Sequence, residues 1–72
     1  MNSSETELSI VIPAYNEEEI LEKEMKALVF KLNDAFKHVG YEIILVENGS
    51  TDNTLSIAKA LALAYPQIKV IS

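Results

Sequence analysis

The spacing of apolar residues along the chain predicts three β-strands. A β-branched run at 8–12 predicts the first strand, and we expect Pro13 to end it because proline donates no hydrogen bond to a sheet. Residues 41–46 and 68–71 predict two further strands. Since the apolar run within 41–46 does not alternate with polar residues, we expect that strand to be buried on both faces, as in parallel sheets.

A long amphipathic helix is predicted between the first two strands. Apolar residues recur at steps of three and four from Leu21 to Val39, which places them on one helical face. Asn16 and Glu19 have the spacing of a capping box and predict the start of this helix. Gly40 suits the position that follows the end of a helix.

An Ala- and Leu-rich segment at 54–65 predicts a second helix, which Pro66 ends. The resulting β-α-β-α-β order predicts an α/β fold with three parallel strands joined by right-handed crossovers. Two such crossovers in one direction place both helices on one face of the sheet. The other face is then left bare, as in the first half of a doubly wound, Rossmann-like domain.

Composition narrows the class of protein. The 72 residues are 49% hydrophobic and 24% charged, which is typical of a globular chain, although a core this small supplies only about 3–5 kcal/mol. With no Cys and one His, the sequence excludes a disulfide framework and a thiolate or multi-His zinc site. The net charge of −5 argues against binding nucleic acid or anionic lipid.

The first residues and the hydropathy of the chain predict its location in the cell. Residues 1–7 are polar and acidic, which predicts a disordered leader without a signal peptide, followed by a partial domain at 8–72. No apolar run approaches the roughly 18 residues that a membrane span needs. We therefore predict a cytoplasmic chain, which a larger parent protein could still attach to a membrane.

Polar and conformationally special residues gather where the first two strands end. The segments 13–17 and 47–52 follow those strands, and ligands of parallel sheets bind beyond the carboxyl ends of the strands. Tyr15 is placed there, where its ring could stack on a base. Several neighbours also have a purely structural interpretation as helix caps or turn residues, namely Asn16, Asn48, Gly49, Ser50, Thr51 and Asp52.

The chain has no glycine-rich phosphate-binding motif. Glu17, Glu18 and Glu19 would neutralise the start of the first helix, so a backbone cradle for phosphate is not expected. An acidic edge of this kind would need a divalent cation to hold a diphosphate.

Two segments resemble inverting family 2 glycosyltransferases. Residues 9–19, SIVIPAYNEEE, resemble the opening of that family, and residues 41–54, YEIILVENGSTDNT, resemble its second strand and acidic turn. The resemblance covers residues 8–72, the start of the family's domain. It implies the GT-A fold and transfer of a sugar from a nucleotide diphosphate donor, commonly a UDP- or GDP-sugar.

The resemblance also implies a nucleotide site. Tyr15 would lie against the base and Glu17 near the ribose, while Glu47 and Asn48 stand where the family usually has two Asp residues. The implied nucleotide-binding residues are Pro13, Ala14, Tyr15, Glu17, Glu47 and Asn48, with Asn16, Ser50 and Asp52 supporting the loops. Asn48 departs from the family pattern, because an amide oxygen accepts from a base N–H but brings no charge, so the base stays open.

The family's metal-binding Asp-x-Asp motif and its acceptor-activating carboxylate lie further along the family's domain. Asp34 and Asp52 do not form that motif. We therefore expect no catalytic residue and no metal ligand in this chain, and no sugar transfer by it alone. Mg²⁺ or Mn²⁺ is expected in a full-length relative, a hexosyltransferase.

A chain of this pattern could have a function of two other classes. A non-enzymatic interaction module would use the bare sheet face to self-associate or to dock on a partner. A βαβ redox or signalling domain of another family is disfavoured, because the chain has no Cys pair and no Asp at a strand's carboxyl end.

Overall fold

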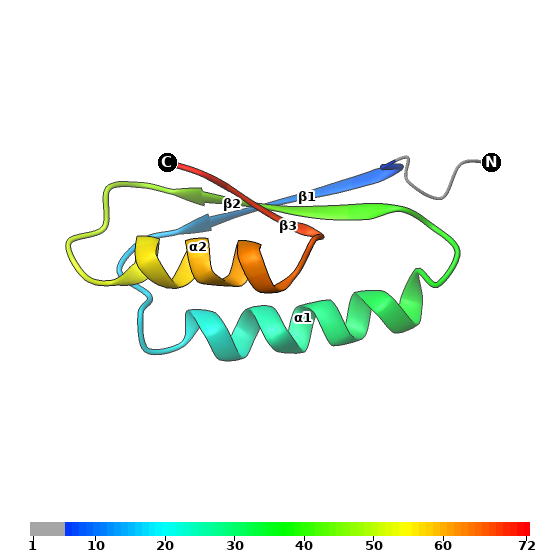
Figure 1. The fold of residues 1–72 in the computed structure, drawn as a ribbon, viewed down its shortest axis with the longest axis horizontal. Coiled ribbons are helices and arrows are strands. Elements are labelled where there is room, and N and C mark those ends of the chain that lie inside the picture. Colours follow the sequence, from blue (N-terminus) through cyan, green and yellow to red (C-terminus); the bar gives the residue numbers. More distant parts are fainter. Residues whose placement is uncertain (1–5) are drawn as a thin grey trace.

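A computed structural model of the chain describes residues 6–72 and contains three strands and two helices (Figure 1). In chain order they are β1 (Leu8–Ala14), α1 (Leu21–Ala35), β2 (Tyr41–Glu47), α2 (Thr54–Ala64) and β3 (Ile68–Ile71). Strand β2 lies between β1 and β3, and both pairings are parallel. The predicted β-α-β-α-β order is confirmed. The predicted leader at 1–7 lies mostly outside the described residues.

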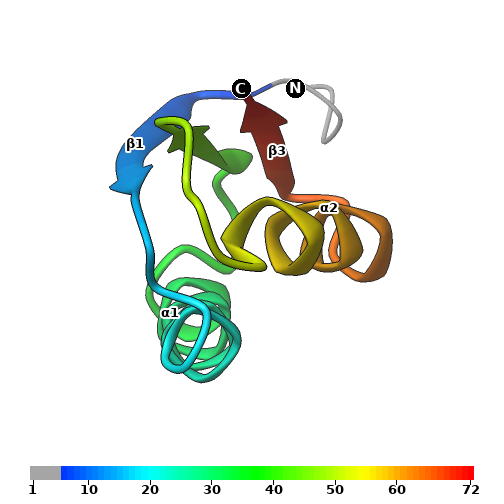
Figure 2. The ribbon, with the colours of Figure 1, turned by 90° about the vertical axis from the view of Figure 1, so that its left-hand side faces the viewer.

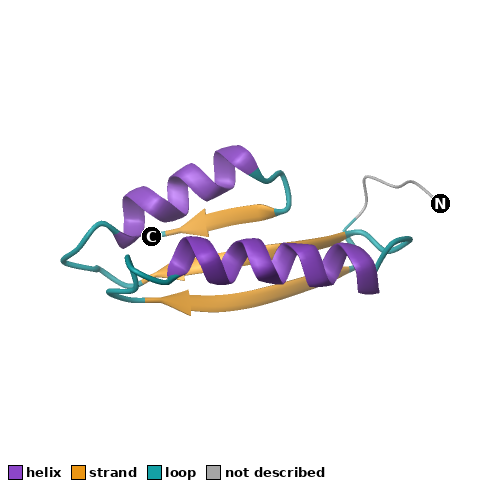
Figure 3. Cartoon of the chain, turned by 90° about the horizontal axis from the view of Figure 1, so that it is seen from below, coloured by secondary structure: helices purple, strands orange, loops and turns teal. Residues whose placement is uncertain are grey.

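Both helices lie on the same face of the sheet (Figure 2). They run side by side, and from the helix side α1 is seen across β1 and β2 and α2 alongside β3 (Figure 3). Helix α2 packs against both β3 and β2. No element within residues 6–72 covers the opposite face. This open sheet is consistent with the first half of a Rossmann-like domain.

The core lies between the helices and the covered face of the sheet. Successive side chains of a strand point to opposite faces, so alternate residues of β2 face the helices. Ile43 and Leu45 are fully buried there. The apolar core consists of Ala14, Leu21, Met25, Val29, Ile43, Leu45, Ala58, Leu61 and Ile68.

The bare face of the sheet carries apolar side chains that the described chain leaves accessible. Val11 is 62% exposed and Ile71 is 55% exposed. Ile44 and Val46 on β2 are only half-buried. Within residues 6–72, β2 is therefore covered on one face, because all helical cover lies on one side, as the right-handed crossovers predict.

Strand β1 continues past the predicted end. Pro13 lies within β1 and pairs with Val46, and the strand ends one residue later at Ala14. A proline is tolerated here because β1 is an edge strand of the described sheet, where a missing N–H need not cost a ladder bond.

Helix α1 is shorter than predicted at both ends. Ile20 is its N-cap residue, and no side chain of the described residues hydrogen-bonds there, so the capping box of Asn16 and Glu19 is wrong. Asn16 has a φ of +49°, a left-handed conformation that turns the chain instead of starting a helix. The helix ends with Phe36 as its C-cap, so Gly40 lies beyond the position predicted for it.

The acidic residues at 17–19 precede the helix instead of forming its first turn, which contains Glu22 and Glu24. Gly40 contributes a backbone contact instead of ending the helix. Its carbonyl accepts hydrogen bonds from the amides of Glu7 and Leu8, which joins the start of β1 to the start of β2.

Candidate functional site

The carboxyl ends of β1 and β2 lie side by side, with Ala14 paired to Glu47. The chain leaves these ends as two segments, residues 15–20 and residues 48–53, which we call the first and second rim segments. Together they form the rim, at the left of the molecule in Figure 1. This is the edge at which parallel sheets bind ligands.

Hydrogen bonds join the first rim segment to the second rim segment and the start of α2. Three successive backbone amides of the first segment donate across the gap: Asn16 N to Ser50 Oγ at 2.9 Å, Glu17 N to Thr54 Oγ1 at 2.8 Å and Glu18 N to Asp52 Oδ2 at 3.3 Å. Bonds also run in the reverse direction: Thr51 N donates to Asn16 Oδ1 at 2.9 Å and Asn53 N to Glu18 Oε1 at 3.0 Å. The relative position of the two segments is therefore fixed by side chains as well as by the sheet.

Glu47 is turned into its own loop. Its side chain is 6% exposed, and its two oxygens accept from the amides of Gly49 at 3.0 Å and Ser50 at 2.7 Å. Hydrogen bonds from the hydroxyl and the amide of Ser50 hold the pKa of Glu47 below its ordinary value, because they favour the charged form. Gly49 takes a φ of +70°, which lets the loop fold back over this carboxylate.

Carboxylates already occupy the start of α2. Asp52 Oδ1 accepts from the amide and the hydroxyl of Thr54, and these bonds lower the pKa of Asp52. The N-cap residue is Asn53, whose own side chain makes no capping bond with the described residues. Of the predicted caps, Asp52 does bond to the first amide of α2, whereas Ser50 and Thr51 bond to Asn16. Because the amides of Asn53 and Thr54 already donate to the carboxylates of Glu18 and Asp52, this helix start is a poor site for a phosphate.

The structure brings most of the predicted nucleotide-binding residues to the rim. Tyr15 is 54% exposed, and Pro13 and Asn48 are exposed as well. Glu17 is partly exposed. Ala14 is different, because its side chain is fully buried and only its backbone reaches the rim, where its carbonyl accepts from the Asn48 amide at 3.2 Å.

Sequence reasoning missed the roles of Glu18 and Thr54. Glu18 was assigned to a helical turn, whereas its backbone and side chain both bond to the second rim segment. Thr54 is fully buried, and its hydroxyl accepts from the Glu17 amide. A Thr in the first turn of an Ala-rich helix gave a signal of a polar contact, but no local pattern indicates a partner 37 residues away.

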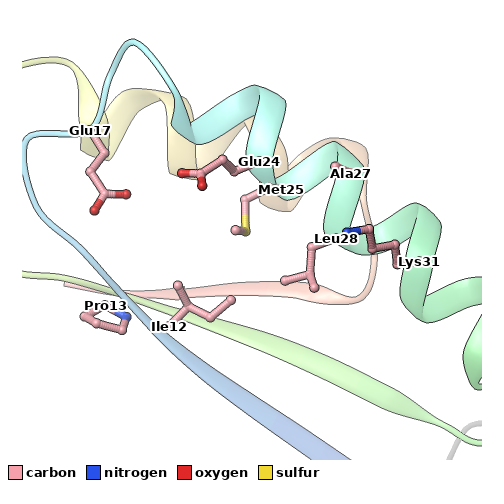
Figure 4. A pocket seen from close by; sticks show the side chains of 8 residues that line it. All are labelled: Ile12, Pro13, Glu17, Glu24, Met25, Ala27, Leu28 and Lys31. Carbon is pink, nitrogen blue, oxygen red and sulfur yellow. The ribbon is translucent and has the colours of Figure 1, made fainter.

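Two hollows adjoin the rim. One of about 350 Å³ is lined by the acidic residues of the first rim segment together with Asp52. The other, of about 490 Å³, lies between β1 and α1, where Met25 and Leu28 of the helix point toward Ile12 of the strand, and Glu24 and Lys31 lie on the helix to either side (Figure 4). Neither is an enclosed pocket of the kind that buries most of a ligand.

Residues 6–72 contain no group of three or more His, Cys, Asp or Glu side chains placed to hold a metal ion. Over the same residues, neither helix has the length and apolar character needed to cross a bilayer.

Comparison with known proteins points to one family. Residues 9–72 match the family model described as glycosyl transferase family 2. The chain is 32% identical over 71 residues to glycosyltransferase AglE of Haloferax volcanii. These residues make up 99% of this chain and 22% of that protein.

Two further relatives are also sugar transferases by name. A dolichol-phosphate mannosyltransferase of Pyrococcus furiosus is 39% identical over 64 residues, which covers 89% of this chain and 17% of that protein. An undecaprenyl-phosphate 4-deoxy-4-formamido-L-arabinose transferase of Yersinia pestis is 42% identical over 64 residues, covering 86% and 18%. The chain thus spans about a fifth of the length of these relatives.

Proposed function

Because the chain belongs to glycosyl transferase family 2, we propose that its rim binds the nucleotide part of a nucleotide-sugar donor, of the UDP or GDP type. In a full-length protein this binding would serve transfer of the sugar to an acceptor. The chain's own part is to hold the nucleoside, and we assign it no catalytic residue.

The observation that carries this proposal is the exposed ring of Tyr15 on a fixed backbone. Tyr15 follows Ala14, whose carbonyl bonds to the Asn48 amide, and precedes Asn16, whose amide bonds to Ser50. The backbone on both sides of this 54% exposed residue is thus bonded in place, so its ring offers a stacking surface for a base at little cost in ordering the backbone.

Asn48 supplies polar recognition in this proposal. Its side chain is exposed at the end of β2 and carries both an acceptor and donors. An amide can therefore pair with the imide edge of uracil or with the N1–H and O6 edge of guanine. Glu47 supports the loop that presents Asn48, since both of its oxygens already accept loop amides.

The diphosphate needs a partner that the described residues do not supply. The rim is acidic, the start of α2 is occupied by carboxylates, and residues 6–72 hold no metal-binding group. The proposal therefore leaves Mg²⁺ or Mn²⁺ to other parts of a full-length relative and derives no step through it.

The test is titration of the 72-residue chain with UDP and GDP, followed by ligand-observed NMR and calorimetry. We expect saturable binding that Tyr15→Ala weakens by about 5- to 150-fold, because stacking on an aromatic ring contributes about 1–3 kcal/mol per base. Phe30→Ala is the matched control, since it removes a 77% exposed aromatic ring from α1 and should leave binding unchanged. No binding at millimolar nucleotide would refute the proposal for this chain.

A second candidate function is an interaction module that self-associates through the bare sheet face. The observation in its favour is the exposure of Val11 and Ile71 on that face. Sedimentation at several concentrations discriminates between the two candidates. A monomer over the whole concentration range that unfolds cooperatively would count against the module.

A further inference from the structure

Asn16 combines two properties, of which its neighbour Glu18 shares the second but not the first. It is the non-glycine residue with a positive φ among residues 6–72. It also exchanges hydrogen bonds with the second rim segment through both its backbone and its side chain. Its amide donates to Ser50 Oγ at 2.9 Å, and its Oδ1 accepts from Thr51 N at 2.9 Å.

These contacts place Asn16 next to both groups that the proposed site presents. Tyr15 is the preceding residue, and the loop that holds Ser50 and Thr51 is the loop that begins with Asn48. On its other side, Tyr15 is fixed by the hydrogen bond from the Asn48 amide to the Ala14 carbonyl. The backbone of Tyr15 is therefore attached to the second rim segment both before and after the aromatic ring.

We propose that Asn16 is a positioning residue, which sets the placement of Tyr15 relative to Asn48 by bridging the two rim segments. This inference rests on the proposed nucleotide-binding function. Asn suits the role because it tolerates the left-handed conformation and also carries a short side-chain acceptor. Its role as the cap of α1, expected from sequence, is replaced by a bridge to the segment that leads into α2.

The two properties can be separated by substitution. Asn16→Gly keeps the left-handed backbone accessible and removes the acceptor. Asn16→Asp keeps both the acceptor and the tolerance of the left-handed conformation. The first readout is amide hydrogen exchange at Thr51, followed by NMR. It reports the bridging bond directly and does not depend on a nucleotide.

We expect Thr51 exchange to rise about five- to tenfold in Asn16→Gly and to stay near the wild-type rate in Asn16→Asp, because one hydrogen bond is removed only in the first variant. Exchange at Ile43 and Leu45 in β2 should be unchanged in both variants, which shows that the fold is retained. An unchanged Thr51 rate in Asn16→Gly would overturn the inference.

The second readout is UDP affinity, compared between the wild type and Asn16→Gly because both are uncharged at this position. We expect at least about a threefold loss, since a site that is no longer pre-positioned binds less well. Loss of Thr51 protection with unchanged UDP affinity would also overturn the inference. If the wild type binds neither UDP nor GDP, the proposed function fails, and the exchange experiment alone decides whether Asn16 bridges the segments.

Discussion

The two faces of the sheet carry similar residues in different surroundings. On β2, Ile43 and Leu45 face the helices and are fully buried, whereas Ile44 and Val46 face away and are half-buried. On β1 and β3, the outward-facing Val11 and Ile71 are more than half exposed. At these positions both faces carry aliphatic residues, and the helices make one face a core. Elsewhere the bare face also carries the polar residues Ser9, Glu42 and Lys69.

This difference indicates where the fold obtains its stability. Burial of apolar area contributes roughly 25 cal/mol per Å², and only the covered face contributes in full. The exposed Val11 and Ile71 on the bare face make it a candidate for contact with further protein.

The strongest test of the difference between the two faces truncates one side chain on each face of β2. Leu45→Ala should cost roughly 2–5 kcal/mol, which is about the whole stability of so small a core, so we expect this variant to be unfolded at 25 °C. Ile43→Val, at about 0.5–1.5 kcal/mol, keeps the loss measurable. Urea unfolding followed by circular dichroism provides the values.

Val46→Ala is the matched control on the bare face, and it should cost about 1 kcal/mol or less. A loss as large as that of Leu45→Ala would show that the bare face is covered in solution and would break the contrast.

A second, smaller effect concerns the carboxylate of Glu47, which follows Ile43 and Leu45 on the covered face of β2. The pKa of Glu47 is lowered in the folded chain, so its charged form adds stability at neutral pH. This contribution should be lost as the pH falls below about 4.5, the ordinary value, toward the lowered folded pKa. We therefore expect Glu47→Gln to be less stable than the wild type at pH 7, with the difference shrinking toward pH 3.

Glu42→Gln is the matched control for this experiment, because Glu42 lies on the same strand and points to the bare face. Urea unfolding at pH 7, 5, 4 and 3 gives both comparisons. Equal losses at pH 7 for the two variants would contradict a special role for the buried carboxylate.

The smallest effect on stability is expected on the bare face itself. Val11→Lys should change the free energy of unfolding by no more than about 0.5 kcal/mol, since Val11 is 62% exposed. The same substitution should abolish any concentration-dependent sedimentation, because a charge would then interrupt the apolar surface. Association that survives both Val11→Lys and Ile71→Lys would place the contact elsewhere on the molecule.

The order and type of the elements were predictable from the sequence because they follow from periodic burial. The strand at 68–71 was predicted at its observed bounds, and α2 ends one residue earlier than predicted. Single-face packing of the helices follows from the handedness of the crossovers. These features depend on the local hydrophobic pattern and on the handedness of the chain, and both can be judged from a single sequence.

The details of the rim were not predictable in the same way. Asn16 and Glu19 match a capping box locally, but Asn16 bonds to Ser50 and Thr51, which lie 34 and 35 residues along the chain. The position of the rim was predicted from the strand ends, whereas its bonding pattern depends on which side chains the parallel pairing of β1 and β2 brings together. The nucleotide-binding roles of the rim residues remain predictions.

The hydrogen bonds across the rim close chain loops that strand pairing has already closed. The pairing of β1 with β2 joins residues 33 apart, as Ser9 and Glu42 illustrate, and the rim bonds join residues 34 to 37 apart. Loop-closure entropy rises only slowly with length, so almost no additional entropy is lost once the strands have paired. We therefore expect the rim to form late and rapidly during folding, and to be ordered in every molecule whose two strands are in register.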